Sequence, residues 1–187
     1  MPRAFDVALA ALALLVLSPI LLAAAIGIRL GSRGPVVYRQ RRVGRSGQEF
    51  ELLKLRTMVQ GSDPVGVGKV VARDDPRVTA TGRLLRRTSL DEIPNLVNVL
   101  RGEMAIVGPR PTIPAQVEDY TPFQHRRHEV RPGLTGWAQV QGRAGIPWEE
   151  RIVLDVEYVD RRSLGLDLRI LAKTAWLLVT GHGLAPD

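Results

Sequence analysis

Hydrophobic side chains are concentrated near the N-terminus, where Val7 to Ile28 form a run without a charged residue. A straight helix of this length is about 33 Å long, which is enough to cross a lipid bilayer. Ser18-Pro19 lies at its midpoint, and proline removes a backbone donor and clashes with the preceding turn. The pattern therefore predicts a helix kinked at Pro19, where the Ser18 hydroxyl bonds to a carbonyl that the kink leaves free. Each half then reaches about 16 Å, the depth of one leaflet.

On its residues alone, this segment has three interpretations. A kinked helix that spans the membrane is the simplest, since proline is common in such helices. A signal peptide would be cleaved after small residues such as Ala23-Ala24-Ala25, but the apolar run continues to Ile28 and basic residues behind it would hinder export. A re-entrant helix, which enters and leaves by one face, would keep Arg3 and those basic residues on the cytoplasmic side.

Beyond this run, the alternation of apolar and polar positions is typical of one compact α/β unit. The predicted strands are Pro35–Gln40 and Phe50–Leu55, with a short apolar run at Met104–Val107, and helices are predicted after Ser89, over Pro147–Asp160 and over Leu164–Val179. The last helix is expected to pack on the core rather than lie in the membrane interface. The glycine-rich segment Gly61–Gly68 lacks the lysine spacing of a nucleotide-binding P-loop, so it predicts no phosphate site.

The charge of the chain indicates an anionic partner. The 187 residues favour one domain, lack cysteine for disulfides or thiolate metal sites, and carry a formal net charge of +7. Between Arg29 and Arg56, eight basic and two acidic residues give +6, nearly all of that charge. A basic cluster directly after an apolar run is attracted to anionic lipid on the cytoplasmic side, although nucleic acid and phosphorylated small molecules are also candidate partners.

Two adjacent carboxylates, Asp91 and Glu92, are candidates for catalysis. An ionised Asp can attack phosphorus, and an adjacent Glu can hold a divalent cation. Three arginines precede them and favour a phosphate substrate: Arg83, Arg86 and Arg87. Ser89 and Glu92 are also spaced as in a capping box, and on this segment alone a helix-capping role for Glu92 is the favoured interpretation.

The sequence Gly108-Pro109-Arg110-Pro111 predicts a rigid turn that presents one arginine. A rigid arginine suits bidentate recognition of phosphate oxygens, although an ordinary solvated loop fits the pattern equally well. His125 and His128 share a helix face, but without cysteine or a clear third ligand they predict no zinc site.

Several motifs along the chain together carry a family resemblance. They are Arg3-Ala4-Phe5-Asp6, Ser18-Pro19, Lys54-Leu55-Arg56-Thr57-Met58, Asp75-Pro76-Arg77-Val78-Thr79, Thr88–Pro94, Asn98–Met104, Val107–Pro111, Arg131–Val140 and Gly142-Arg143. In this order they resemble the monotopic phosphoglycosyl transferases, also called the bacterial sugar transferase family, nearly from end to end. Two departures bear on donor preference: Gln141 stands where Asn is common, and Asn95 where Gln is common.

The resemblance implies an α-rich α/β fold in two parts. Residues 1–30 would form a re-entrant membrane helix broken at Ser18-Pro19, and residues 31–187 a small cytoplasmic catalytic domain with amphipathic helices on the membrane surface. It also implies a place at the bacterial inner membrane, with the catalytic domain on the cytoplasmic face, and membrane lipid but no nucleic acid as a partner.

The resemblance further implies a phosphotransfer reaction in two steps. Asp91 would attack the sugar-bearing phosphate of a UDP-sugar, release UMP and form a phospho-sugar ester, which polyprenol (undecaprenyl) phosphate would then attack. Glu92, with Asp91, would bind Mg²⁺. Basic residues would hold the phosphate oxygens: Lys54, Arg56, Arg87, Arg110 and Arg143. The product would initiate assembly of a surface glycan such as exopolysaccharide, O-antigen or capsule.

Two rival interpretations remain open on the sequence. A non-enzymatic basic protein on a membrane or on nucleic acid fits the charge, but no nucleic-acid-binding motif occurs and only nine aromatic residues are spread along the chain. An enzyme in which polyprenol phosphate attacks the UDP-sugar directly, without a covalent intermediate, fits the same motifs.

Overall fold

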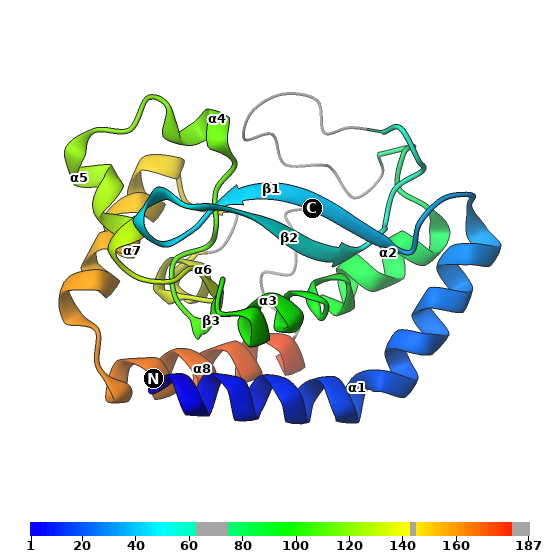
Figure 1. Cartoon of the computed structure of the whole chain (residues 1–187), viewed down its shortest axis with the longest axis horizontal. Coiled ribbons are helices and arrows are strands. Elements are labelled where there is room, and N and C mark those ends of the chain that lie inside the picture. Colours follow the sequence, from blue (N-terminus) through cyan, green and yellow to red (C-terminus); the bar gives the residue numbers. More distant parts are fainter. Residues whose placement is uncertain (63–74, 143–144, 181–187) are drawn as a thin grey trace.

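The computed structural model describes residues 1–62, 75–142 and 145–180, and it is rich in helix with two small sheets (Figure 1). The helices are α1 (Arg3–Gly31), α2 (Ala80–Arg87), α3 (Asn95–Arg101), α4 (Pro114–Val117), α5 (Pro122–His125), α6 (Trp137–Gln141), α7 (Trp148–Arg161) and α8 (Leu164–Thr180), with 3-10 turns η1 (Arg45–Gly47), η2 (Leu90–Glu92) and η3 (Arg126–Glu129). The strands are β1 (Val37–Val43), β2 (Glu49–Leu55), β3 (Ala105–Val107) and β4 (Gly133–Thr135). Most of the predicted loop Gly61–Gly68, and the predicted ligand Arg143, lie outside the described residues.

The N-terminal helix α1 is continuous from Arg3 to Gly31 and contains Pro19. Figure 1 shows that it bends part-way along its length. Pro19 has no N–H to donate to the carbonyl of Leu15, four residues earlier, and the Ser18 hydroxyl donates to that oxygen instead, at 2.8 Å. The bend and the hydrogen bond that the sequence predicts for Ser18 are therefore both present.

By length and composition, α1 is the one helix in the described part of the chain that could cross a membrane. Its buried side chains are only Asp6, Ala10 and Ile28. Large apolar side chains are exposed along the rest of it, including Leu12, Leu15, Val16, Leu22, Ile26 and Leu30. An exposed apolar surface of this extent is typical of a segment in contact with a membrane. The re-entrant path and the domain boundary at residue 30 stay predictions.

The main hydrophobic core joins α1, α3, β3 and α8. Its most buried members, at most 1% exposed, are Ala10, Val99, Met104, Tyr158 and Ile170. Leu14 and Leu17, on the N-terminal half of α1, pack against this core. The first half of the apolar helix is therefore fixed to the part of the fold that carries the candidate site.

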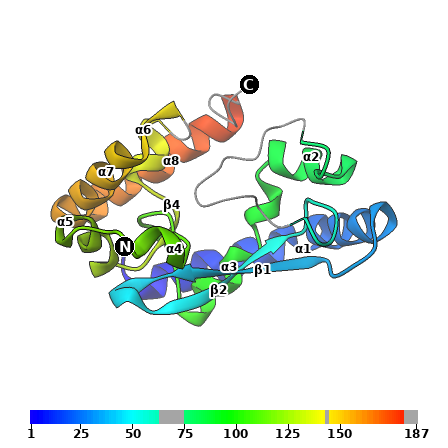
Figure 2. The same ribbon diagram turned by 90° about the horizontal axis from the view of Figure 1, so that it is seen from above.

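Helices α1 and α8 begin close together. The amine of Met1 forms an ion pair with Asp167 in the first turn of α8, and the Tyr158 hydroxyl donates to the same carboxylate at 2.7 Å. Both helices lie along one side of the molecule in Figure 1, and Figure 2 shows that they diverge from this common start. Ile170 and Leu177 of α8 belong to the core, so the predicted packing of the last helix is confirmed.

Two small sheets complete the fold. β1 and β2 form an antiparallel hairpin in which Tyr38 is opposite Lys54, and β3 and β4 pair in parallel with Val107 opposite Thr135. The sequence predicts β1 and β2 with shifted ends, and the short apolar run at Met104–Val107 contains β3. It does not predict β4, because three residues that include a glycine are too few to show alternation. Helix α2 is likewise absent from the sequence prediction.

Candidate active site

Asp91 and Glu92 lie in η2, a single turn between α2 and α3. The chain enters this turn through Ser89, whose φ of 56° places it in the left-handed region that L residues rarely adopt. A capping residue needs extended backbone, and the Ser89 side chain caps no helix. The capping-box interpretation of Glu92 is therefore wrong, and its carboxylate is free to bond to other elements.

Glu92 is held between two cations from opposite sides of the site. Its Oε1 accepts hydrogen bonds from Lys54 Nζ of β2 at 2.8 Å and from Arg110 Nη2 at 2.6 Å, and its side chain is 20% exposed. Burial by itself would raise the pKa of Glu92, but the charges and hydrogen bonds of Arg110 and Lys54 outweigh it and hold that pKa well below its usual range. Glu92 is therefore a permanent carboxylate at neutral pH.

A buried amide sets the position of Lys54 against Glu92. Asn98 of α3 is fully buried; its Oδ1 accepts from the Leu53 N–H at 3.1 Å, and its Nδ2 donates to the Glu51 carbonyl at 2.7 Å. These two bonds tie the backbone of β2 to α3. Lys54 follows Leu53 in β2, and Glu92 precedes α3. The Asn98 side chain therefore fixes the distance between Lys54 and Glu92, the two partners of the ion pair.

The turn that carries Arg110 is supported by a close approach of backbone. A Cβ at Gly108 would lie 2.4 Å from the carbonyl oxygen of Arg131, so only glycine fits where β3 ends. On the other side, Arg42 of β1 donates to the Pro111 carbonyl at 3.0 Å. The predicted rigid turn is therefore present, and the Arg110 side chain remains half exposed at its tip.

A buried ion pair lies behind this turn. Arg127 and Asp155 of α7 are each 3% exposed and form an ion pair. Arg127 also donates to the Arg110 carbonyl at 2.8 Å and to the Tyr120 hydroxyl at 3.0 Å, and it lies over the Trp148 ring at 5.5 Å from the centroid. Arg127 therefore connects α7 to the backbone of the arginine that pairs with Glu92. This role of Arg127 could not be predicted from the sequence, because its partners are far apart in the chain.

The surroundings of Asp91 differ from those of Glu92. Burial raises the pKa of Asp91, and the charge of Glu92 adds to this effect, while Lys54, Arg110 and Arg86 oppose it. Arg86 of α2 is half-buried and donates to the Thr57 hydroxyl at 2.9 Å. The two carboxylates therefore have pKa values shifted in opposite directions, which is typical of sites where neighbouring carboxylates have different functions.

Two arginines that the sequence analysis did not assign to the site line it in the structure. They are Arg86 and Arg42. Burial, with the nearby charge of Arg110, lowers the pKa of Arg42 to about 10. A guanidinium that is desolvated and faces another cation is stabilised by a bound anion. The signal for Arg86 was its place among three arginines before the carboxylates, and the signal for Arg42 was its place in the basic hairpin.

One of the predicted phosphate ligands, Arg56, bonds to another part of the fold. Arg56 is buried, and its guanidinium donates to the carbonyls of Ile28, Ser32 and Arg33 at the C-terminal end of α1. These bonds indicate a structural role. Arg87 is exposed at the end of α2. Arg143 lies outside the described residues.

The arrangement is suited to a doubly or triply charged anion. Two carboxylates are surrounded by four cations, namely Lys54, Arg110, Arg42 and Arg86. Within residues 1–62, 75–142 and 145–180, no group of three or more His, Asp or Glu side chains could hold a metal by itself. A diphosphate would offset the excess positive charge and leave the carboxylates next to its phosphorus atoms.

Comparisons with known proteins agree with this chemistry. Residues 1–181 match the family described as bacterial sugar transferase. The chain is 44% identical over 182 residues to the uncharacterized sugar transferase EpsL of Bacillus subtilis, covering 97% of this chain and 89% of that protein. It is 45% identical to the UDP-glucose:undecaprenyl-phosphate glucose-1-phosphate transferase of Caulobacter vibrioides (95% and 69% covered) and 42% identical to the undecaprenyl-phosphate glucose phosphotransferase of Komagataeibacter xylinus, of which it spans 34%. The chain therefore belongs to the bacterial sugar transferase family.

Proposed function

We propose that this chain transfers a sugar-1-phosphate from a UDP-sugar to undecaprenyl phosphate, releases UMP, and so initiates assembly of an exopolysaccharide or related surface glycan. The activities by which several relatives are named support the donor and the acceptor, and two further relatives are exopolysaccharide production proteins of rhizobia. The observation that carries the proposal is the pair Asp91 and Glu92, set among cations that match a diphosphate.

In the first step, the ionised carboxylate of Asp91 attacks the sugar-bearing phosphorus. A bond forms between a carboxylate oxygen and phosphorus, and the bond from that phosphorus to the bridging oxygen breaks, so that UMP leaves. Arg110 and Lys54 can exchange Glu92 for phosphate oxygens, because both side chains are partly exposed. Arg42 and Arg86 add positive charge that stabilises the transition state.

In the second step, a phosphate oxygen of undecaprenyl phosphate attacks the same phosphorus. The bond to Asp91 breaks, the carboxylate is restored, and the product is an undecaprenyl diphosphate sugar. The same cations serve both steps, since both place negative charge at one phosphorus. Burial destabilises the ionised carboxylate of Asp91 and so raises its pKa. The phospho-sugar ester removes this charge from the carboxylate, so burial favours its formation.

Mg²⁺ fits this site together with the diphosphate rather than alone. Mg²⁺ is usually held by one or two protein carboxylates plus substrate phosphates, and Glu92 with Asp91 provides such a pair. Glu92 stays ionised, as a ligand must, but it already bonds to two cations. When bound, the ion would neutralise diphosphate charge and assist the leaving group.

The proposed function is tested by measuring UMP release from UDP-glucose and UDP-N-acetylgalactosamine with and without undecaprenyl phosphate. We expect lipid-dependent turnover with one donor, and exchange of labelled UMP into that donor without acceptor, because the covalent step is reversible. Turnover without exchange would indicate direct attack by the acceptor. The absence of UMP release from any UDP-sugar would contradict the proposal.

The metal assignment predicts a joint loss of activity and Mg²⁺ dependence. Glu92→Gln should lower turnover by roughly 100-fold or more and weaken the dependence on Mg²⁺, because the neutral amide is a poor metal ligand and cannot form an ion pair with Arg110 or Lys54. EDTA in excess should stop the wild type, and added Mg²⁺ should restore it. Unchanged wild-type turnover in EDTA would exclude a required divalent cation.

The raised pKa of Asp91 predicts the acid limb of the pH profile. Below that pKa Asp91 is protonated and cannot attack, so kcat/KM should fall as the pH drops, starting above the ordinary aspartate range. Lys54 lowers this pKa, so Lys54→Gln should move the acid limb to higher pH. Arg101→Gln, an exposed change at the end of α3, is the control. A limb that moves to lower pH in Lys54→Gln would contradict the assignment.

The proposed location is the bacterial inner membrane, with the catalytic part on the cytoplasmic face and both ends of α1 on that side. Because the chain has no cysteine, Ala4→Cys provides a single site before the apolar run. In intact cells, a membrane-impermeant thiol reagent should not label it, whereas lysed cells should give full labelling. Ser18→Leu with Pro19→Ala removes the break and should increase labelling from outside. Labelling of the parent Ala4→Cys protein in intact cells would indicate a spanning helix.

A further inference from the structure

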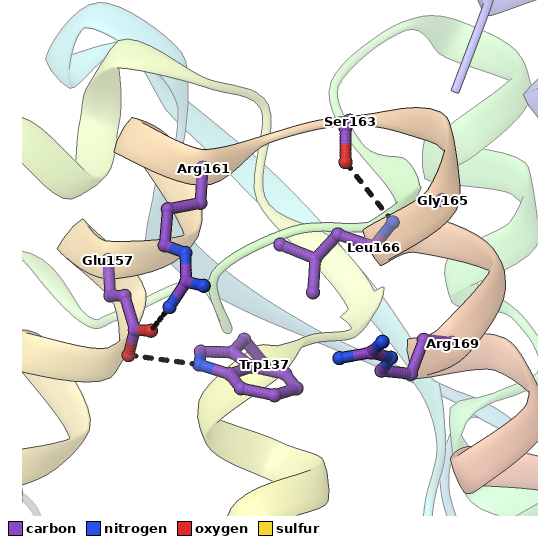
Figure 3. Close-up of a pocket in the computed structure, with 7 residues that line it drawn as sticks. All are labelled: Trp137, Glu157, Arg161, Ser163, Gly165, Leu166 and Arg169. Atoms are coloured by element: carbon purple, nitrogen blue, oxygen red, sulfur yellow. Dashed lines mark hydrogen bonds and ion pairs between the residues drawn. The ribbon is translucent and has the colours of Figure 1, made fainter.

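A pocket of about 440 Å³ opens where α7 ends and α8 begins, away from the carboxylates. Figure 3 shows the Trp137 ring on one side of it, the Arg169 guanidinium on another, and the end of α7 with Glu157 and Arg161 beside them. None of the residues that line it bonds to Asp91, Glu92 or Arg110. The proposed reaction therefore does not account for this pocket.

The charges in the pocket leave one cation without a partner. Both oxygens of the Glu157 carboxylate accept a hydrogen bond, one from Trp137 Nε1 at 3.1 Å and the other from Arg161 at 2.6 Å. Arg169 points toward the pocket and, within the described part of the chain, forms no hydrogen bond or ion pair. Two guanidiniums and one carboxylate give a net positive charge, and guanidinium groups bind phosphate oxygens well.

The neighbourhood of the pocket indicates that the anion carries an apolar part. Leu164 and Leu168, in the first turns of α8, are 55% and 51% exposed next to the pocket-lining Leu166. This end of α8 lies on the side of the molecule where the apolar helix α1 begins (Figure 1). Arginine beside exposed leucine at a membrane boundary is suited to a headgroup with acyl chains.

We propose that this pocket binds the phosphate of an anionic phospholipid, with Arg169 and Arg161 on the phosphate and the acyl chains over Leu164 and Leu168. The inference rests on the proposed function, which supplies the membrane attachment and places the phosphate of the acceptor at Asp91. The lipid acceptor is excluded as the intended occupant because its phosphate must reach Asp91. Binding here orients α8, and with it the core, on an anionic membrane surface.

The test is a calorimetric titration of the protein in a non-ionic detergent with short-chain phosphatidylglycerol, phosphatidylcholine and inorganic phosphate. We expect phosphatidylglycerol to bind and Arg169→Gln to weaken it about tenfold, as for the loss of a charge-assisted hydrogen bond. Arg169→Lys should retain part of the affinity. Arg101→Gln is the matched control, because it removes the same charge from an exposed position at the end of α3, outside the residues that line the pocket.

Four results would overturn the proposal. Equal binding of phosphatidylcholine would mean that the pocket does not select charge, and equal binding of inorganic phosphate would assign it to a free anion. An equal loss of affinity in Arg169→Gln and Arg101→Gln would mean that only the net charge of the protein matters. Transfer assays in detergent without phospholipid should give Arg169→Gln the wild-type KM for undecaprenyl phosphate, and a raised KM would assign the pocket to the acceptor. Since binding is measured without turnover, failure of the proposed reaction would not affect this result.

Discussion

Asp91→Asn is expected to abolish sugar-phosphate transfer, with a loss of roughly 10⁴-fold or more, as found when a covalent nucleophile is removed. The amide has nearly the same shape as the carboxylate but is a poor nucleophile toward phosphorus. Glu92, Lys54 and Arg110 would keep their mutual bonds, because no hydrogen bond among them involves Asp91. The measurement is UMP release, together with exchange of labelled UMP into the donor, and both should be lost.

The stability of the same variant separates catalysis from folding. Burial disfavours the ionised form of Asp91 in the folded state, so replacing it with a neutral amide should leave the melting temperature unchanged or raise it at neutral pH. Asp160→Asn, which alters an exposed ion pair with Arg126, should keep near-wild-type turnover. Substantial turnover by folded Asp91→Asn that is free of deamidated protein would contradict the covalent role.

Helices and strands could be predicted where the pattern of apolar and polar positions repeats over enough residues. The apolar run, the hairpin strands and the two C-terminal helices have long patterns, whereas β4 has three residues and no alternation. The bend at Pro19 was predictable because its cause is local: proline lacks a donor, and Ser18 supplies one next to it. Local causes can be read from sequence, but contacts between distant elements cannot.

The candidate site shows this limit most clearly. The carboxylates, Lys54 and Arg110 were assigned to the site from their motifs. The contacts between them were not predicted, since Lys54 and Glu92 are 38 positions apart and are brought together by Asn98. Arg56 was assigned to phosphate because of its motif. The N–H donors of a guanidinium suit phosphate oxygens, but they also suit the free carbonyls at the end of a helix. In the structure, the Arg56 guanidinium donates to such carbonyls after α1. Helix α2 was not predicted, so the sequence alone did not indicate that Arg86 faces Asp91.

Replacement of Arg127 with methionine is expected to lower the free energy of unfolding by roughly 3–5 kcal/mol, because it leaves Asp155 buried without its partner. The measurement is a denaturant titration in detergent. Asp155→Asn should have a smaller effect, since an amide can still accept a hydrogen bond from Arg127. A loss below about 1 kcal/mol in Arg127→Met would indicate that Asp155 is accessible to water or to another cation.

The double change Arg127→Met with Asp155→Leu separates stability from positioning. Two apolar side chains of similar volume should recover most of the stability, because replacing a buried ion pair in this way is often neutral. Activity should not recover, because the Arg110 carbonyl still lacks the hydrogen bond that Arg127 donates at 2.8 Å. A residual defect of about tenfold in kcat, with normal stability, would identify Arg127 as a positioning residue for Arg110. Recovery of both stability and kcat would mean that Arg127 only stabilises the fold, and that the turn of Arg110 is held by Gly108 and Arg42 alone.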